Sequence, residues 1–209
     1  MTDLHRALTV YVEAKEFMIA SGFSGELLWQ EGISFEDIAE SDFLREAAWV
    51  ILCSGFRESI LRKMFSGVSL CFCDWESAAA ITENAHVCKL TAMDIFRNQR
   101  KIDAIIELAS TVVDLGFSEL KERIAIDPIP QLQALPYIGP ITSWHLAKNL
   151  GFNVANPDRH LASLAKTLGF LNAHCLCSEL ASATGDTDAV IDLVLWRYSA
   201  ENAGRTKSA

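Results

Sequence analysis

The segment from Leu132 to Phe170 constrains the fold most, because it holds two helix starts and one tight turn at short spacing. Residues 135–140 read Leu-Pro-Tyr-Ile-Gly-Pro. Proline is favoured in the first turn of a helix, because its missing N–H would have no intrahelical acceptor there. We therefore expect a short helix to end before this turn and a second helix to run from Pro140 to about Leu150. We expect Gly139 to take the positive φ that the turn needs.

The start of helix 140–150 predicts an anion site. The first backbone N–H groups of a helix lack intrahelical partners and point outward, and the helix dipole makes this end positive. Phosphate groups bind at such helix ends. The turn at Gly139 is therefore expected to hold a phosphate through backbone N–H groups.

The second part of the segment predicts a helix with a carboxylate at its start. Gly151 is suited to end helix 140–150, and Gly169 to end the next helix, residues 159–168. Asp158 precedes that helix directly and is a favoured residue type for capping its N–H groups. A plain helix cap is one interpretation of Asp158, and a functional carboxylate is the other.

Two motifs in this segment resemble the DNA glycosylases of the helix-hairpin-helix–Gly/Pro/Asp superfamily. Leu135-Pro-Tyr-Ile-Gly139 resembles the Leu-Pro-Gly-Val-Gly hairpin of that family. Pro157-Asp158-Arg-His160 resembles its Val-Asp-x-His segment about twenty residues on, whose aspartate is catalytic. Hairpin and aspartate at matching distance favour the catalytic interpretation of Asp158 over a plain cap. The resemblance covers roughly residues 43–170.

The resemblance implies an all-α fold of two helical lobes with a cleft. We expect residues 1–42 and 171–209 to form a terminal lobe and residues 43–170 the glycosylase-like core, unless the whole chain is one compact domain. It also implies base excision from double-stranded DNA, in which a damaged or modified base is flipped into the cleft. Asp158 is then expected to stabilise the positive charge that develops on the sugar and to activate the attacking water.

Two departures from the family's hairpin bear on how firmly the chain is expected to hold DNA. Tyr137 replaces the first hairpin glycine, and Pro140 removes one N–H that is a candidate for phosphate binding. The bifunctional members carry a Schiff-base lysine where this chain has Ile141, and Lys148 lies two turns further along the helix. The resemblance therefore implies a monofunctional glycosylase without lyase activity. A non-catalytic module that binds DNA or protein is the main alternative, and a bifunctional glycosylase/lyase is the less favoured one.

The remaining candidate residues follow from their places in these motifs. The residues expected to contact DNA are Tyr137, Ile138, Gly139, Ile141, Lys148 and Arg159. The pocket candidates are Gly55, Phe56, Ile141, Trp144 and His145. By register Gly55 falls near the family's gap-filling glutamine, so Phe56 or Arg57 is expected to fill the gap left by a flipped base. Trp29 and Trp49 are further stacking candidates, although aromatics at helical spacing more often lie in a core.

The net charge of −9 speaks against DNA binding until its distribution is considered. Residues 1–46 hold ten acidic residues against three Lys or Arg, whereas residues 135–178 hold Lys148, Arg159 and Lys166 against Asp158 alone. Local potential, and not total charge, steers a polyanion. We expect weak non-specific DNA affinity that falls quickly with salt.

The six cysteines predict no metal site. Cys71 and Cys73, like Cys175 and Cys177, are separated by one residue, whereas zinc pairs have two to four between them. Buried thiols are the favoured interpretation of these residues and of Cys53 and Cys88. The four closely spaced cysteines of a cluster-bearing glycosylase are absent from the sequence, so no metal or organic cofactor is expected.

The chain has no apolar run of about 18 residues, so no transmembrane helix is expected. Its acidic N-terminus lacks a signal-peptide pattern, which favours a cytoplasmic protein without membrane contact. We also expect a monomer. Apolar spacing predicts helices and no sheet. The expected helices cover 3–21, 26–29, 43–53 (capped by Ser41 or Asp42), 56–65, 75–82, 83–93 (a weak helix or a loop), 96–113, 117–124, 140–150, 159–168, 175–183 and 188–199. We expect a connector at 67–73, a rigid turn at 127–130 and a mobile tail at 201–209.

Overall fold

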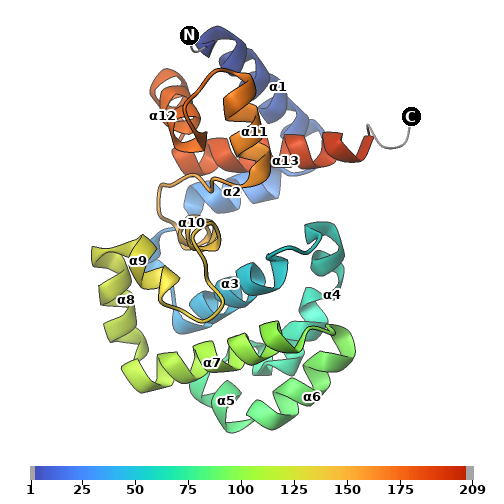
Figure 1. Cartoon of the computed structure of the whole chain (residues 1–209), viewed down its shortest axis with the longest axis vertical. Helices are drawn as coiled ribbons and strands as arrows, with labels where there is room; N and C mark the ends of the chain where they lie inside the picture. The colour runs from blue at the N-terminus through green and yellow to red at the C-terminus, as the bar shows by residue number, and fades with distance from the viewer. Residues whose placement is uncertain (1–2, 206–209) are drawn as a thin grey trace. The chain divides into compact units, whose positions relative to one another are not determined.

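The computed structural model describes residues 3–205, and within this range every regular element is a helix. Thirteen α-helices and two 3-10 helices follow one another along this part of the chain (Figure 1). The predicted all-α class is therefore confirmed. Between residues 3 and 205, the structure contains no helix long and apolar enough to cross a membrane.

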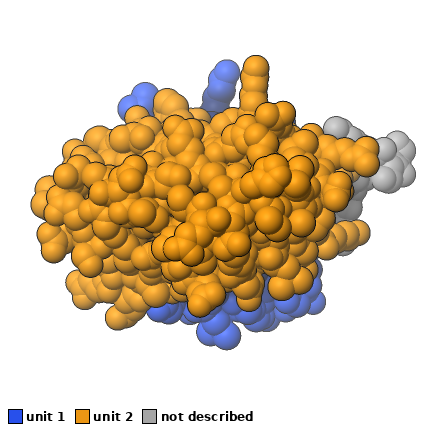
Figure 2. Space-filling view, turned by 90° about the horizontal axis from the view of Figure 1, so that it is seen from below, with its two compact units in different colours: residues 1–34, 151–209 blue, residues 35–150 orange. Residues whose placement is uncertain are grey.

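The chain forms two compact units, coloured separately in Figure 2. Unit 1 comprises residues 1–34 and 151–209, and unit 2 comprises residues 35–150. These boundaries differ from the expected ones at 42 and 170. Residues 151–170 join unit 1 because α11 (Arg159–Thr167) packs against α12 (Ala173–Thr184) and α13 (Asp188–Arg205). Residues 35–42 join unit 2, where the Lys121 ammonium donates to the carbonyls of Glu36 (2.7 Å) and Ile38 (2.8 Å).

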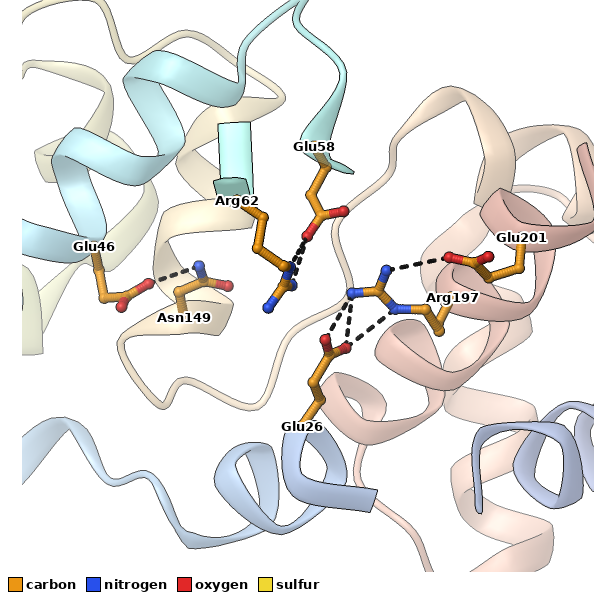
Figure 3. A network of polar contacts seen from close by, with 7 residues as sticks. All are labelled: Glu26, Glu46, Glu58, Arg62, Asn149, Arg197 and Glu201. Atoms are coloured by element: carbon orange, nitrogen blue, oxygen red, sulfur yellow. Dashed lines mark hydrogen bonds and ion pairs between the residues drawn. The ribbon is translucent and has the colours of Figure 1, made fainter. Parts of the chain in front are cut away.

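Unit 1 is built around the contact between its two longest helices, α1 (Leu4–Ala20) and α13. Ala7, Tyr11, Ala14 and Met18 recur at helical spacing on α1 and are almost fully buried. Helix α2 (Ser24–Gly32) adds an ion pair: the Arg197 side chain, 5% exposed, donates to Glu26 at 2.8 and 3.1 Å (Figure 3). Such a buried, two-pronged pair fixes α13 against α2.

Unit 2 is centred on α3 (Glu40–Cys53) and α7 (Gln99–Leu115), which pack against each other. Both carry continuous buried faces, and Asn98 caps α7 by accepting the N–H of Lys101 at 3.3 Å. Around them lie η1 (Phe35–Asp37), α4 (Glu58–Cys71), η2 (Cys73–Trp75), α5 (Ala78–Glu83), α6 (Ala85–Ile95), α8 (Phe117–Ile126), α9 (Pro128–Gln133) and α10 (Thr142–Asn149).

Helix α4 runs through most of the predicted connector at 67–73, so that prediction is wrong. The chain turns only after Phe72, through Cys73, Asp74 and Trp75, all of which have positive φ (55°, 49° and 63°). Three consecutive left-handed residues other than glycine are uncommon. This turn carries Trp75 into the core, where it is 2% exposed. Apolar spacing alone did not mark this turn, because Phe72, Cys73 and Trp75 continue the apolar run of α4 on both sides of the single exposed residue Asp74.

Three further local predictions need correction. Ala39, and neither Ser41 nor Asp42, is the N-cap of α3, because the Asp42 carboxylate reaches back to the Ala39 N–H (3.2 Å). The rigid turn expected at 127–130 is the start of α9, with Pro128 in its first turn. Helix α13 continues to Arg205, through the first part of the expected tail. The last part of that tail, 206–209, lies outside the described residues. In the segment 83–93, left open as a weak helix or a loop, Glu83 ends α5 and residues 85–93 lie in α6.

Candidate DNA-contact surface and Asp158

The turn between α9 and α10 has an aromatic residue where its backbone favours glycine. Leu135 to Ile138 form a turn closed by the Ile138 N–H donating to the Leu135 carbonyl (3.2 Å). Pro136 occupies the second position, and Tyr137, in the third, has a φ of 64°. This is the arrangement of a type II turn, whose third position favours Gly or Asn. A left-handed residue other than glycine costs about 1–2 kcal/mol.

Gly139 does not take the positive φ predicted for it, because Tyr137 makes that turn instead. The Gly139 N–H, expected to bind phosphate, donates to the Thr142 hydroxyl at 2.6 Å. The Gly139 carbonyl accepts the Ser143 N–H (2.9 Å), so Pro140 does lie in the first helical turn although regular helix begins at Thr142. The N–H groups of Ile141 and Thr142 are therefore the first candidates for an anion at this helix start.

The structure separates the predicted DNA-contacting side chains into exposed and buried ones. Tyr137 is 44% exposed and Ile141 49% exposed. Ile138 is 5% exposed and Lys148 6% exposed, so neither side chain presents a surface for DNA. The Ile138 side chain packs inward from the turn and its N–H is used within the turn, while Lys148 is on the buried side of α10. DNA contact by these two residues stays a prediction that their side-chain burial does not support. Arg159, in unit 1, is exposed.

Helix α10 contributes two half-buried pocket candidates, Trp144 and His145. Burial, with a smaller contribution from the charge of Lys148, lowers the pKa of His145 to about 3. The imidazole is therefore neutral at neutral pH and no source of positive charge for DNA. At the end of α10, the Asn149 amide donates to Glu46 of α3 at 3.0 Å (Figure 3). Burial raises the pKa of Glu46, against the opposing effects of Arg45 and this hydrogen bond.

The remaining two pocket candidates lie between α3 and α4. Gly55 is exposed with a φ of 66°, which lets the chain reverse after α3. Phe56 follows it with its N–H donating to the Cys53 carbonyl (2.9 Å) and its side chain 40% exposed. Its ring packs against Phe96 with centroids 5.1 Å apart. Phe56 is thus an aromatic side chain held at the surface of unit 2.

Lys101 links this junction to the hairpin. Its ammonium donates to the carbonyls of Leu52 (2.6 Å) and Ser54 (2.5 Å), which are left without helix partners where α3 ends. The same nitrogen lies 5.7 Å from the ring centroid of Phe96 and 5.9 Å from that of Tyr137. Lys101 is 3% exposed, and burial lowers its pKa to about 8, so it is still charged at neutral pH.

The other stacking candidates differ in how they are held. Trp49 is half-buried, edge-on to Phe65 at 4.9 Å, with the Arg62 guanidinium 5.7 Å from its ring centroid. Arg62 is itself paired with Glu58, one turn earlier in α4 (Figure 3). Trp29, in unit 1, is 41% exposed. Trp49 is therefore packing in unit 2, as the helical spacing of aromatics suggests.

Asp158, in unit 1, is the N-cap of α11 as its position in the sequence predicts. One carboxylate oxygen, Oδ1, accepts the N–H groups of His160 and Leu161, both at 2.9 Å. These two bonds fix the carboxylate while Oδ2 takes part in neither of them. A carboxylate oriented in this way is suited to stabilise a developing cation or to orient a water molecule.

Two neighbours of Asp158 complete this part of unit 1. The Asn156 carbonyl accepts the Asp158 N–H at 2.7 Å, while its side-chain Oδ1 is buried and has no hydrogen-bond partner in the described structure. The Arg159 guanidinium, on the other side, lies 3.4 Å from the His160 ring nitrogen. Across the described residues, no group of three or more His, Cys, Asp or Glu could hold a metal ion.

Comparison with known proteins is informative at the level of structure. No protein family and no curated protein matches the sequence. The structure is similar to the 8-oxoguanine DNA glycosylase of Thermotoga maritima, with a TM-score of 0.59 and 19% identity over 91% of this chain and 95% of that one. It is also similar to the Methanocaldococcus jannaschii 8-oxoguanine glycosylase/lyase in complex with DNA containing 8-oxoguanine. Here the TM-score is 0.55, with 17% identity over 90% of this chain and 94% of that one.

This chain has the fold of these 8-oxoguanine DNA glycosylases. The resemblance stated for residues 43–170 is therefore confirmed for the fold, and the likeness extends over nearly the whole chain. Sequence reasoning placed Asp158 and the hairpin but missed the connecting role of Lys101. Lys101 lies in the helix expected over 96–113, yet nothing in that pattern showed that its side chain turns inward to the end of α3.

Proposed function

We propose that the protein is a DNA N-glycosylase that removes a damaged or modified base from double-stranded DNA without a lyase step. The observation that carries this proposal is Asp158, a carboxylate fixed at the start of α11 in a chain with a glycosylase fold. Both similar structures are named for 8-oxoguanine, which makes that base the first substrate to test.

Asp158 is proposed to act on the sugar and not on the base. Breaking an N-glycosidic bond leaves positive charge on the sugar, and a fixed carboxylate lowers the energy of that state. The same carboxylate orients the attacking water and accepts its proton. The two N–H donors to Oδ1 keep the group in place, so little reorganisation is needed during the reaction.

The absence of a lyase step is proposed from the residues of the hairpin. Ile141, at the position of the family's Schiff-base lysine, is 49% exposed and has no nucleophile. Lys148 is buried on α10, and the Lys101 ammonium is occupied by two carbonyls. The name of the Methanocaldococcus jannaschii protein includes a lyase, so a direct test is needed.

The non-catalytic alternative is favoured by one observation of the hairpin. Thr142 accepts the Gly139 N–H, and Pro140 has none, so two candidate phosphate donors are unavailable. Weaker phosphate binding would hold DNA less firmly for catalysis. A protein with this fold could then bind DNA or another protein without excising a base. The experiment below separates this alternative from the glycosylase.

Asp158→Asn tests the proposal, because asparagine also caps helices well and the variant should fold. Asp3→Asn is the matched control, since Asp3 caps α1 by accepting the Arg6 N–H (3.0 Å). Both variants and the wild type are incubated with duplexes containing 8-oxoguanine, hypoxanthine, uracil or an alkylated adenine. Strand breaks are scored with and without hot alkali, and borohydride trapping is run in parallel.

We expect alkali-dependent breaks from the wild type and from Asp3→Asn, with about 10²–10⁴-fold slower excision by Asp158→Asn. Breaks without alkali, together with a borohydride-trapped complex, would show that the proposed absence of a lyase step is wrong. Equal activity in Asp158→Asn would remove this carboxylate from the reaction. DNA binding without excision of any base would support the non-catalytic module.

A further inference from the structure

Tyr137 has a backbone conformation that its side chain makes unfavourable. Its φ of 64° lies in the left-handed region, which glycine adopts without the steric conflict of a Cβ atom. Burial of the side chain does not offset this unfavourable energy, since the side chain is 44% exposed at the surface of unit 2. Backbone strain of this kind persists where the rest of the structure enforces it, and it concentrates at functional sites.

Lys101 is the group that holds the Tyr137 ring. Its nitrogen lies 5.9 Å from the ring centroid and is itself anchored to Leu52 and Ser54 at the end of α3. A cation at this distance attracts the face of an aromatic ring. Because the ammonium is fixed by two carbonyl acceptors, the ring it attracts has a defined place on the surface.

The same ammonium brings a second exposed aromatic side chain into the arrangement. Lys101 also contacts the ring of Phe96, and Phe96 packs edge-on against Phe56. Tyr137 and Phe56 are therefore two exposed rings attached to one buried support of Phe96 and Lys101. We call these two exposed rings the aromatic pair.

Positive charge accompanies the aromatic pair along the chain. The exposed residues Arg57 and Arg97 directly follow Phe56 and Phe96, and Arg100 directly precedes Lys101. Aromatic faces combined with basic side chains are the chemistry by which proteins hold unpaired bases, since every base has a stacking face and every nucleotide carries a phosphate.

We propose that the aromatic pair binds an unpaired nucleobase of DNA, with Tyr137 as the stacking residue and Lys101 as its positioning residue. The proposal depends on the proposed function in one respect. A glycosylase that opens a duplex at one position would supply the unpaired base. Tyr137 replaces a glycine that the turn favours because an aromatic face there contributes to DNA binding.

The test measures DNA affinity and thermal stability separately. Stacking requires an aromatic ring at position 137, whereas the backbone conformation there favours glycine. Tyr137→Gly removes the ring and relieves the backbone, whereas Tyr137→Phe keeps the ring and the strain. Each variant is titrated with a duplex carrying a stable abasic-site analogue opposite 2-aminopurine, whose fluorescence reports stacking. Thermal unfolding is recorded for the same samples.

We expect Tyr137→Gly to unfold at the same or a higher temperature than the wild type and to bind this duplex about 10- to 100-fold more weakly. Tyr137→Phe should bind within about 2-fold of the wild type, because the ring that stacks is retained. Wild-type affinity in Tyr137→Gly would overturn the proposal. A lower unfolding temperature for that variant would also overturn it, because the ring would then be structural.

Lys101→Met gives a second, independent test of the positioning role. Methionine fills similar space without the charge, so the Tyr137 ring loses its anchor. We expect weaker binding in Lys101→Met, but no further loss when it is added to Tyr137→Gly. Additive losses in the double variant would show that Lys101 acts on DNA independently of Tyr137, contrary to the proposal.

These measurements do not depend on excision. If the wild type binds the abasic duplex but removes no base, the proposed glycosylase function fails and the stacking proposal is still decided by the Tyr137 variants. If the wild type excises a base and Tyr137→Gly binds normally, the stacking proposal alone fails.

Discussion

The two turns of unit 2 that contain left-handed residues other than glycine differ in what offsets their backbone cost. At Cys73–Trp75 three consecutive residues have positive φ, and the side chain of the last one, Trp75, is buried in the core. Trp75 stacks on Phe72 with ring centroids 5.3 Å apart, and its indole N–H donates to the Ser69 hydroxyl at 2.9 Å. At Tyr137 a single left-handed residue presents its ring to solvent.

Magnitudes separate the two cases. Three left-handed residues cost about 3–6 kcal/mol at about 1–2 kcal/mol each. Truncating a buried tryptophan costs about 3–5 kcal/mol, so burial and stacking of Trp75 are of the size needed to hold the first turn. A cation–π contact at an exposed site contributes about 0.5–1 kcal/mol, less than the cost at Tyr137. Strain is thus offset by packing in the first turn and not in the second.

The largest effect is expected from removing the packing at the first turn. Trp75→Ala should lower the free energy of unfolding by about 3–5 kcal/mol, because it leaves a cavity beside Phe72 and keeps the strained backbone. Urea unfolding measures this loss, and DNA affinity per folded molecule should not change. A loss below about 1 kcal/mol would mean that something other than Trp75 holds this turn.

A smaller effect is expected from Ser69, which is 7% exposed and accepts the Trp75 N–H. Ser69→Ala should cost about 1–3 kcal/mol, because it leaves the indole N–H buried without an acceptor. The same urea titration, repeated with Trp75→Phe and the double variant, isolates this hydrogen bond. Once the indole is gone, the loss of the Ser69 hydroxyl should cost much less. If Ser69→Ala lowers the free energy of unfolding equally in the wild type and in the Trp75→Phe variant, the hydrogen bond between these two side chains does not have the assigned role.

The sequence predicted the parts of this structure that depend on local periodicity and capping. Asp158 was predicted as a cap and accepts two N–H groups, because a cap requires only the residue itself and the next three positions. Most helices were predicted for the same reason. The end of α4 and the start of α9 were missed, because apolar runs and prolines there are compatible with both a helix and a connector.

The contacts between distant residues were beyond sequence reasoning. Tyr137, and not Gly139, takes the positive φ, because the hairpin turns two residues earlier than glycine preference predicts. Lys101 reaches carbonyls that lie 49 and 47 positions earlier in the chain, and no spacing rule connects such positions. Lys148 is buried although a lysine is usually a surface residue. Each of these is decided by how the helices of unit 2 pack.

The smallest effect is expected from Asp74→Gly, which relieves backbone strain without removing an aromatic ring and therefore serves as a control for Tyr137→Gly. Asp74 is exposed and left-handed, with φ 49° and ψ 30°, but its side chain supports no ring at the surface. Asp74→Gly should raise the free energy of unfolding by about 0.5 kcal/mol, since aspartate tolerates this region better than tyrosine and glycine loses more entropy on folding. It should leave the affinity for an abasic duplex unchanged, whereas Tyr137→Gly should lower it. If both glycine variants weaken DNA binding equally, backbone rigidity of unit 2 explains the effect, and the Tyr137 ring does not.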